Sequence, residues 1–170
     1  MSKAVKPGPA NGSGRGQART RFARRAVVDA ARTLFLERGY VSTTIEAISE
    51  RSDVPPATVY RLFSSKLGIL KALLDTSIAG DDQPVAVQER PDVATLFAER
   101  DAKKLLAGFA GVTTAINQRT SDVYLVLVSA AGSDPAAAQL LDEIRHQRGQ
   151  GQGQIARSLA RARKIGRAHV

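Results

Sequence analysis

Residues 39–66 read GYVSTTIEAISERSDVPPATVYRLFSSK, and this stretch decides the fold. It holds two short segments with helical apolar spacing, separated by Ser52-Asp53-Val54. Thr43 followed three residues later by Glu46 forms a capping box, so we expect Thr43 to be the N-cap of the first helix. Asp53 lies in the turn, where it tolerates a left-handed backbone better than most residues. The pattern predicts a helix-turn-helix.

The flanking residues predict one helix on each side of this pair. From about Thr20 the apolar residues recur with helical period on one face, and Gly39 is expected to end that helix in a left-handed conformation. Pro56 suits the first turn of the second motif helix. Ser64-Ser65 should end that helix and cap a fourth one, which carries a leucine-rich stripe through Ile78.

Beyond this unit the chain is expected to be helical as well. Residues 80–92 predict a loop, followed by helices over 93–118 and 120–131. Asp134-Pro135 predicts a further helix start, with an N-cap and a proline in the first turn. Residues 123–128 have the propensity of a strand, but no second strand exists to pair with them, so we favour a helix. The predicted fold class is all-α.

Composition restricts the function classes. The chain has 170 residues, a net charge of +9 and no cysteine, which favours a polyanionic partner and excludes disulfides and thiolate metal sites. Its apolar runs are too short for a membrane span and no secretory signal is present, so we expect a cytoplasmic protein without a membrane partner. Residues 1–25 hold seven basic residues and no acid, and 1–18 are expected to form a disordered basic arm.

The C-terminal segment has an unusual composition. Gly149, Gly151 and Gly153 alternate with glutamines, which weakens a helix. Residues 164–170 resemble a translated sequencing adapter, and our hypothesis is that they are non-native and that the gene continues past Arg163. A natural terminus is the alternative.

Residues 20–79 resemble the DNA-binding domain of the TetR family of bacterial transcriptional repressors. The resemblance rests on Ala31-Arg32-Thr33-Leu34-Phe35, Gly39-Tyr40, Thr43-Thr44-Ile45, Ala47-Ile48, Thr58-Val59-Tyr60, Phe63 and Ser65-Lys66. It implies a helix-turn-helix domain over 19–79 that includes a linking fourth helix. It also implies a helical domain over 80–163 that binds a small-molecule effector and dimerises.

The chain departs from the family pattern in three respects. Pro55 and Pro56 stand where many relatives have a serine cap followed by a basic or polar residue, and Leu62 replaces an aromatic residue or histidine. Relatives also end in two further helices that form the dimerisation bundle. The domain over 80–163 is therefore expected to be incomplete, and dimerisation of this chain is doubtful, although the family is homodimeric.

The candidate DNA-binding residues follow from the docking geometry of this motif and from the resemblance. The start of the recognition helix faces base edges, and an arginine there can bind guanine through two hydrogen bonds. These candidates are Pro55, Pro56, Ala57, Thr58 and Arg61. Phosphate contacts are expected from Thr44, through its backbone and the helix dipole, and by resemblance from Tyr60 and Lys66. From the arm we expect contacts from Arg15, Arg19, Arg21 and Arg24.

Simpler explanations exist for several of these residues. Tyr60 could be a partly buried aromatic residue, Lys66 a solvated charge, and the arm arginines a solubilising tail. Phe97, Phe109, Ile116, Tyr124 and Leu127 could line an effector cavity, but apolar residues at helical spacing are more often core, so no ligand-binding residue is assigned.

Taken together, the motif predicts a DNA-binding transcriptional regulator, and the resemblance implies a repressor that a small effector releases from a palindromic operator on double-stranded DNA. The alternatives are a non-specific basic nucleic-acid-binding protein and an inactive truncated fragment of such a regulator. We expect no enzyme, cofactor or metal, because the chain has two histidines, no cysteine and no phosphate-binding glycine loop. The operator, the effector, the regulated genes and the sign of regulation are not encoded in any pattern.

Overall fold

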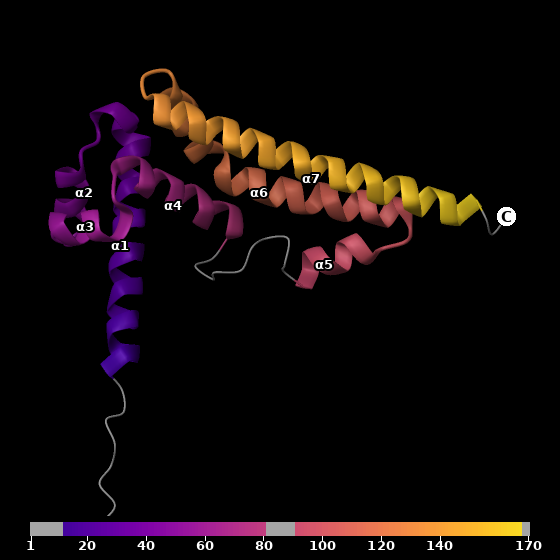
Figure 1. Cartoon of the computed structure of the whole chain (residues 1–170), viewed down its shortest axis with the longest axis horizontal. Coiled ribbons are helices and arrows are strands. Elements are labelled where there is room, and N and C mark those ends of the chain that lie inside the picture. Colours follow the sequence, from indigo (N-terminus) through magenta and orange to yellow (C-terminus); the bar gives the residue numbers. More distant parts are fainter. Residues whose placement is uncertain (1–11, 81–90, 168–170) are drawn as a thin grey trace, which may run out of the picture.

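The computed structural model describes residues 12–80 and 91–167, which form seven helices and no strand. In chain order these are α1 (Gly12–Ser42), α2 (Ile45–Ser52), α3 (Pro56–Phe63), α4 (Lys66–Ala79), α5 (Pro91–Ala98), α6 (Ala102–Ala131) and α7 (Pro135–Arg167). The all-α prediction is confirmed. Figure 1 shows α1–α4 at one end of the molecule and the long α6–α7 hairpin extending away from them, with α5 beside α6.

The first four helices surround a core built from the predicted apolar stripes. Its fully buried members include Leu34 and Phe35 of α1, Ile48 of α2, Val59 of α3 and Leu70 of α4. Gly68 permits the close approach of α4 to α3, because a Cβ at this position would overlap the carbonyl oxygen of Phe63. The small domain is therefore held together by side chains that lie at helical spacing in the sequence.

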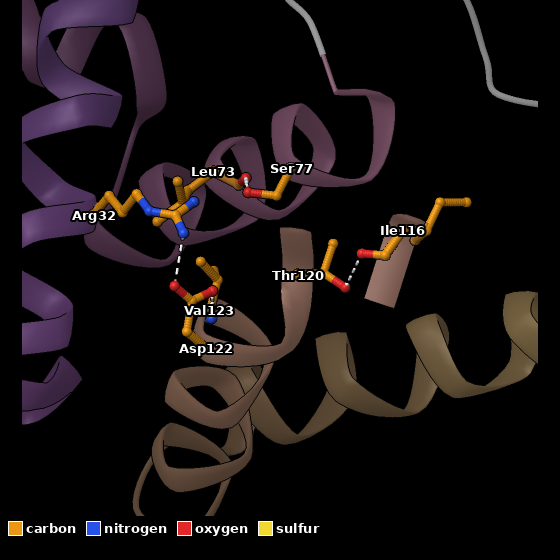
Figure 2. A network of polar contacts seen from close by, with 7 residues as sticks. All are labelled: Arg32, Leu73, Ser77, Ile116, Thr120, Asp122 and Val123. Atoms are coloured by element: carbon orange, nitrogen blue, oxygen red, sulfur yellow. Dashed lines mark hydrogen bonds and ion pairs between the residues drawn. The ribbon is translucent and has the colours of Figure 1, made fainter. Parts of the chain in front are cut away.

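This core continues into the α6–α7 hairpin. Val123, Leu127 and Ala130 of α6, with Ala137 and Leu141 of α7, belong to the same buried cluster as the residues of α1 and α4. Polar contacts reinforce the junction: Figure 2 shows Arg32 reaching from α1 to Asp122 on α6, with 2.6 Å between guanidinium and carboxylate. The head (α1–α4) thus shares one continuous interior with the α6–α7 hairpin of the body (α5–α7).

Most predicted boundaries agree with the structure. Asp53 adopts a left-handed backbone with φ 53° and ψ 32°, and Ser65 caps α4 by accepting from the Gly68 N–H. Pro56 is in the first turn of α3, and Asp134 caps α7. Residues 123–128 are helical, as preferred, and lie within α6.

Four predictions differ from the structure. Residues 12–18, expected to be disordered, belong to α1, and residues 1–11 of the predicted arm lie outside the described residues. Gly39 has a positive φ of 78° but ψ of 168°, so it kinks α1 and a short helical piece continues to Ser42. The helices predicted over 93–118 and 120–131 are instead α5 and an uninterrupted α6 from residue 102 to 131. The fourth difference concerns the cap of α2.

The N-cap of α2 is Thr44, not Thr43. The Thr44 hydroxyl accepts from the Ala47 N–H at 3.1 Å. Thr43 is buried, and its hydroxyl donates to the carbonyls of Gly39 (2.8 Å) and Leu34 (3.2 Å). Two adjacent threonines can each form a cap by pattern alone, and in the structure the Thr43 hydroxyl bonds to the carbonyls of α1 and leaves the cap to Thr44.

Of the predicted loop at 80–92, residues 81–90 lie outside the described part, and α5 begins at Pro91. The three glycines at 149, 151 and 153 are inside α7, which contains the backbone of residues 164–167. Residues 168–170 of the predicted non-native tail are outside the described residues.

Candidate nucleic-acid interface

The turn between α2 and α3 is fixed by local hydrogen bonds. The Val54 N–H donates to the Ser49 carbonyl at 3.3 Å, and the Ser49 hydroxyl donates back to the Val54 carbonyl at 2.6 Å. Both residues are buried. Sequence reasoning missed Ser49, because a serine one turn before the end of a helix gives no signal of a partner five residues ahead. The two short helices are therefore held in a defined mutual orientation.

Four of the predicted base-reading residues are exposed. Ala57 and Arg61, four residues apart, lie on the face of α3 that points away from the core, and Tyr60 beside them is 48% exposed. Pro55 and Pro56 are exposed at the start of the helix. Val59 and Phe63 fill the opposite side, as their spacing predicts. Thr58, the fifth candidate, is half-buried at the edge of the exposed face.

The number of hydrogen-bond donors on the exposed side of α3 increases from its start towards its end. Pro55 and Pro56 carry no N–H, so the start of α3 presents fewer backbone donors than most helices do. Ala57 adds only a methyl group. Arg61 brings the five N–H donors of a guanidinium, and Tyr60 brings a hydroxyl. The start of the helix thus suits apolar contact, whereas its later part suits hydrogen bonds to an acceptor-rich partner.

Thr44 is exposed at the N-terminus of α2. Its hydroxyl oxygen accepts the capping bond from Ala47, and its own O–H remains available to donate. An exposed helix N-terminus also carries partial positive charge. This position is suited to an anion, in agreement with the predicted phosphate contact.

Lys66 has a different environment from the one predicted. Its ammonium donates to the carbonyls of Tyr40 (2.7 Å), Thr43 (2.8 Å) and Val41 (3.3 Å), and lies 4.3 Å from the Tyr40 ring centroid. Burial lowers the pKa of Lys66, and the charge of Asp134 opposes that shift. The three N–H donors of the ammonium are directed at the carbonyls of residues 40–43, which form the corner between α1 and α2 (the α1–α2 corner). The geometry therefore does not favour the expected phosphate contact.

Arg24 likewise points into the head. Its guanidinium donates to the Leu62 carbonyl at 2.8 Å and lies 4.6 Å from the Phe63 ring centroid. A cation at these last carbonyls of α3 is favoured by the helix dipole. Arg15, Arg19 and Arg21 are exposed on the N-terminal half of α1 and are available to a phosphate backbone. Of the predicted arm arginines, Arg24 thus contacts the head itself, whereas Arg15, Arg19 and Arg21 remain available to DNA.

The body offers no comparably specific site. Leu127 is core, and Tyr124 lies under the guanidinium of Arg148, 5.5 Å from its ring centroid. A shallow cavity of about 270 Å³, largely open to solvent, lies between α5 and α6 and is lined by Thr95, Leu96, Glu99, Lys104, Gly108 and Val112. A Cβ at Gly108 would be 2.5 Å from a methyl group of Leu96, so the glycine allows α5 to approach α6.

Within residues 12–80 and 91–167, no group of three or more His, Cys, Asp or Glu side chains could hold a metal ion. His146 is exposed on α7, with Nε2 3.0 Å from the Gln150 amide nitrogen. None of the helices in the described parts of the chain is both long enough and apolar enough to cross a membrane.

The head is similar in sequence to a family of known proteins. Residues 27–73 match the family described as bacterial regulatory proteins, tetR family. The chain is 42% identical over 48 residues to the uncharacterized HTH-type transcriptional regulator YvkB of Bacillus subtilis, covering 28% of this chain and 25% of YvkB. It is 37% identical over 81 residues to the HTH-type transcriptional regulator TcmR of Streptomyces glaucescens, covering 48% of this chain and 35% of TcmR. The matched segments therefore span about a quarter to a third of these relatives.

Proposed function

Since residues 27–73 carry the helix-turn-helix domain of tetR-family regulators, we propose that the protein is a DNA-binding transcriptional regulator whose α3 enters the major groove. The observation that carries this proposal is the exposed face of α3, where Ala57, Tyr60 and Arg61 lie opposite the buried Val59 and Phe63. Arg61 would bind guanine O6 and N7, and Pro56 with Ala57 would contact a thymine methyl. The half-buried Thr58 would add a contact at the edge.

Phosphate contacts would fix the register of α3. Thr44 at the start of α2 and Tyr60 on α3 supply donors on the exposed side of the head. Arg19 and Arg21 extend a basic surface along α1, and both are exposed. These contacts are independent of sequence and weaken as salt rises.

The finer parts of the proposal concern regulation. We propose a cytoplasmic repressor that binds a palindromic operator as a homodimer. Leu125 and Val128 support an interface on α6, because they lie one turn apart and expose apolar surface; Leu125 is 66% exposed. A second copy covering this surface would place two α3 helices on one DNA.

Release by a small effector would act through the body. The α5–α6 cavity is the proposed effector site, with Leu96 and Val112 as apolar lining and Glu99 and Lys104 as polar groups. Its position beside α6 supports this role, because Arg119 of α6 donates to the carbonyls of Ser77 and Ile78 at the end of α4. An effector that binds one arrangement of α6 better than another would shift the population of head positions.

Selection from a pool of random duplexes tests the proposal. The expected result is enrichment of one palindromic site and a dimeric molar mass by light scattering when that site is bound. Binding without enrichment, with a steep salt dependence, would instead identify a non-specific basic protein. Absence of binding to any duplex would identify an inactive fragment.

A further inference from the structure

The turn between α6 and α7 touches the head directly. The carboxylate of Asp134 uses its two oxygens for two tasks: Oδ1 accepts from the N–H groups of Ala136 (2.9 Å) and Ala137 (3.3 Å), which caps α7. Oδ2 accepts from the Tyr40 hydroxyl at 3.1 Å. Asp134 is 94 positions away from Tyr40 along the chain, so this bond joins the body to the end of α1.

Tyr40 transmits this contact into the α1–α2 corner. Its side chain is buried, 6% exposed, and packs against Phe35 with 5.7 Å between ring centroids. The ammonium of Lys66 lies over the same ring and donates to the carbonyls of Tyr40 and Thr43. One side chain thus connects the carboxylate of the body with the cation that holds the corner.

The corner in turn fixes where α2 begins. Thr43 is buried and bonded at both its hydroxyl and its carbonyl, and the next residue, Thr44, is the N-cap of α2. Because Ser49 bonds α2 to the turn before α3, a shift of the corner moves both motif helices. The contact series from Asp134 to Thr44 has no member at the C-terminal end of α4, where Arg119 makes a second polar contact between body and head, nor does it include the Arg32–Asp122 ion pair between α1 and α6.

We infer that Asp134 is a positioning residue for DNA binding: it acts through Tyr40 and Lys66 to hold the start of α2, and with it α3, in the orientation that fits the major groove. The inference rests on the proposed function for its DNA-binding part. Through Asp134, the α6–α7 turn has its own contact with the helix-turn-helix, separate from the contact between Arg119 of α6 and the end of α4. A change in that turn would alter DNA affinity without any movement at the end of α4.

Hydrogen exchange of the free protein tests the connection without DNA. Tyr40→Phe removes only the hydroxyl, and Asp134→Ser keeps an oxygen that can cap α7 but lacks the second one. Both variants should accelerate exchange of the α2 amides of Ala47 and Ile48 by about fivefold, as expected when one hydrogen bond is lost. The matched control is Asp101→Ser, because Asp101 caps α6 through the same kind of backbone bonds, to Lys103 and Lys104.

Two exchange results would overturn the inference. One is unchanged α2 exchange in both Tyr40→Phe and Asp134→Ser. The other is equal acceleration in Asp101→Ser, which would mean that α2 responds to any loss of a helix cap. Acceleration in the first two variants alone would support it. The double variant should be no worse than either single one, because all three lose the same bond.

DNA affinity then tests the functional part. On the selected duplex, Tyr40→Phe and Asp134→Ser should each weaken binding about fivefold, with no change in salt slope because no phosphate contact is lost. Unchanged affinity despite faster α2 exchange would overturn the role in DNA binding. If the wild-type protein binds no duplex, the proposed function and the DNA-binding part of this inference both fail, whereas the exchange result still decides whether Asp134 positions α2.

Discussion

The outer face of α3 and the contacts within the head use the same side-chain types in opposite ways. On α3, Arg61 and Tyr60 point to solvent. Lys66 at the α1–α2 corner and Arg24 beside the end of α3 instead direct their cations at backbone carbonyls and aromatic rings of the head. A basic residue in such a domain is therefore not by itself a DNA contact. Its role depends on whether the fold offers it free carbonyls.

The largest change in stability should come from Lys66→Met. This change removes a charged donor from three carbonyls, and we expect the free energy of unfolding to fall by about 2–3 kcal/mol. Urea unfolding measures this, with Lys71→Met as the control because Lys71 is exposed and pairs only at the surface with Asp75. An unchanged stability together with a salt slope flattened by about one unit would instead identify Lys66 as a phosphate ligand.

Arg61→Ala tests the outer face. Since its side chain is exposed, stability should change by less than about 0.5 kcal/mol, while discrimination at one base position should fall by about 1–3 kcal/mol. Affinities for single-base variants of the selected site measure this. Arg51→Ala is the control, an exposed arginine in the last turn of α2. Equal losses on every sequence would show that Arg61 binds phosphate and does not read a base.

The pair Arg24→Gln and Arg21→Gln compares an inward and an outward arginine of one helix. Arg24→Gln should lower the free energy of unfolding by about 1–2 kcal/mol, because the Leu62 carbonyl and the Phe63 ring lose their cation. Arg21→Gln should leave stability unchanged and reduce the salt slope of DNA binding by about one unit. If both variants changed only the salt slope, the contact of Arg24 with Leu62 and Phe63 would contribute nothing to the free energy of unfolding.

The last comparison concerns the effect of pH on Tyr40. Burial, with the hydrogen bond to Asp134 and its charge adding to it, raises the pKa of Tyr40 to about 12 from an ordinary value of 10.0. The unfolded chain therefore loses this proton first as pH rises. The stability that the hydroxyl contributes is complete below pH 10 and is lost between pH 10 and 12.

Tyr40→Phe lacks this titration, so the gap in stability between wild type and variant should narrow across that range. Urea unfolding at a series of alkaline pH values measures the gap. A gap that stays constant from pH 9 to pH 11.5 would contradict a buried, protonated hydroxyl.

The sequence predicted those features that depend on neighbouring residues. The left-handed Asp53, the proline at the start of α3 and the Ser65 cap each involve partners within a few positions. It could not predict the direction of Arg24 or Lys66, whose partners are 38 and 23–26 residues away. The choice between Thr43 and Thr44 failed although the partners are local, because the kink at Gly39, which the sequence did not predict, decides which hydroxyl is buried.

The central claim is that the outer face of α3 meets DNA, and alkylation of a single introduced cysteine tests it most directly. The chain has no cysteine, so Ala57→Cys gives one reactive thiol on that face, and Ala94→Cys gives an exposed control on α5, away from the proposed α6 interface. Saturating duplex carrying the selected site should slow alkylation of Ala57→Cys by at least about tenfold, because a buried thiol cannot react. It should leave the alkylation rate of Ala94→Cys unchanged. Equal rates at position 57 with and without bound duplex would contradict the claim.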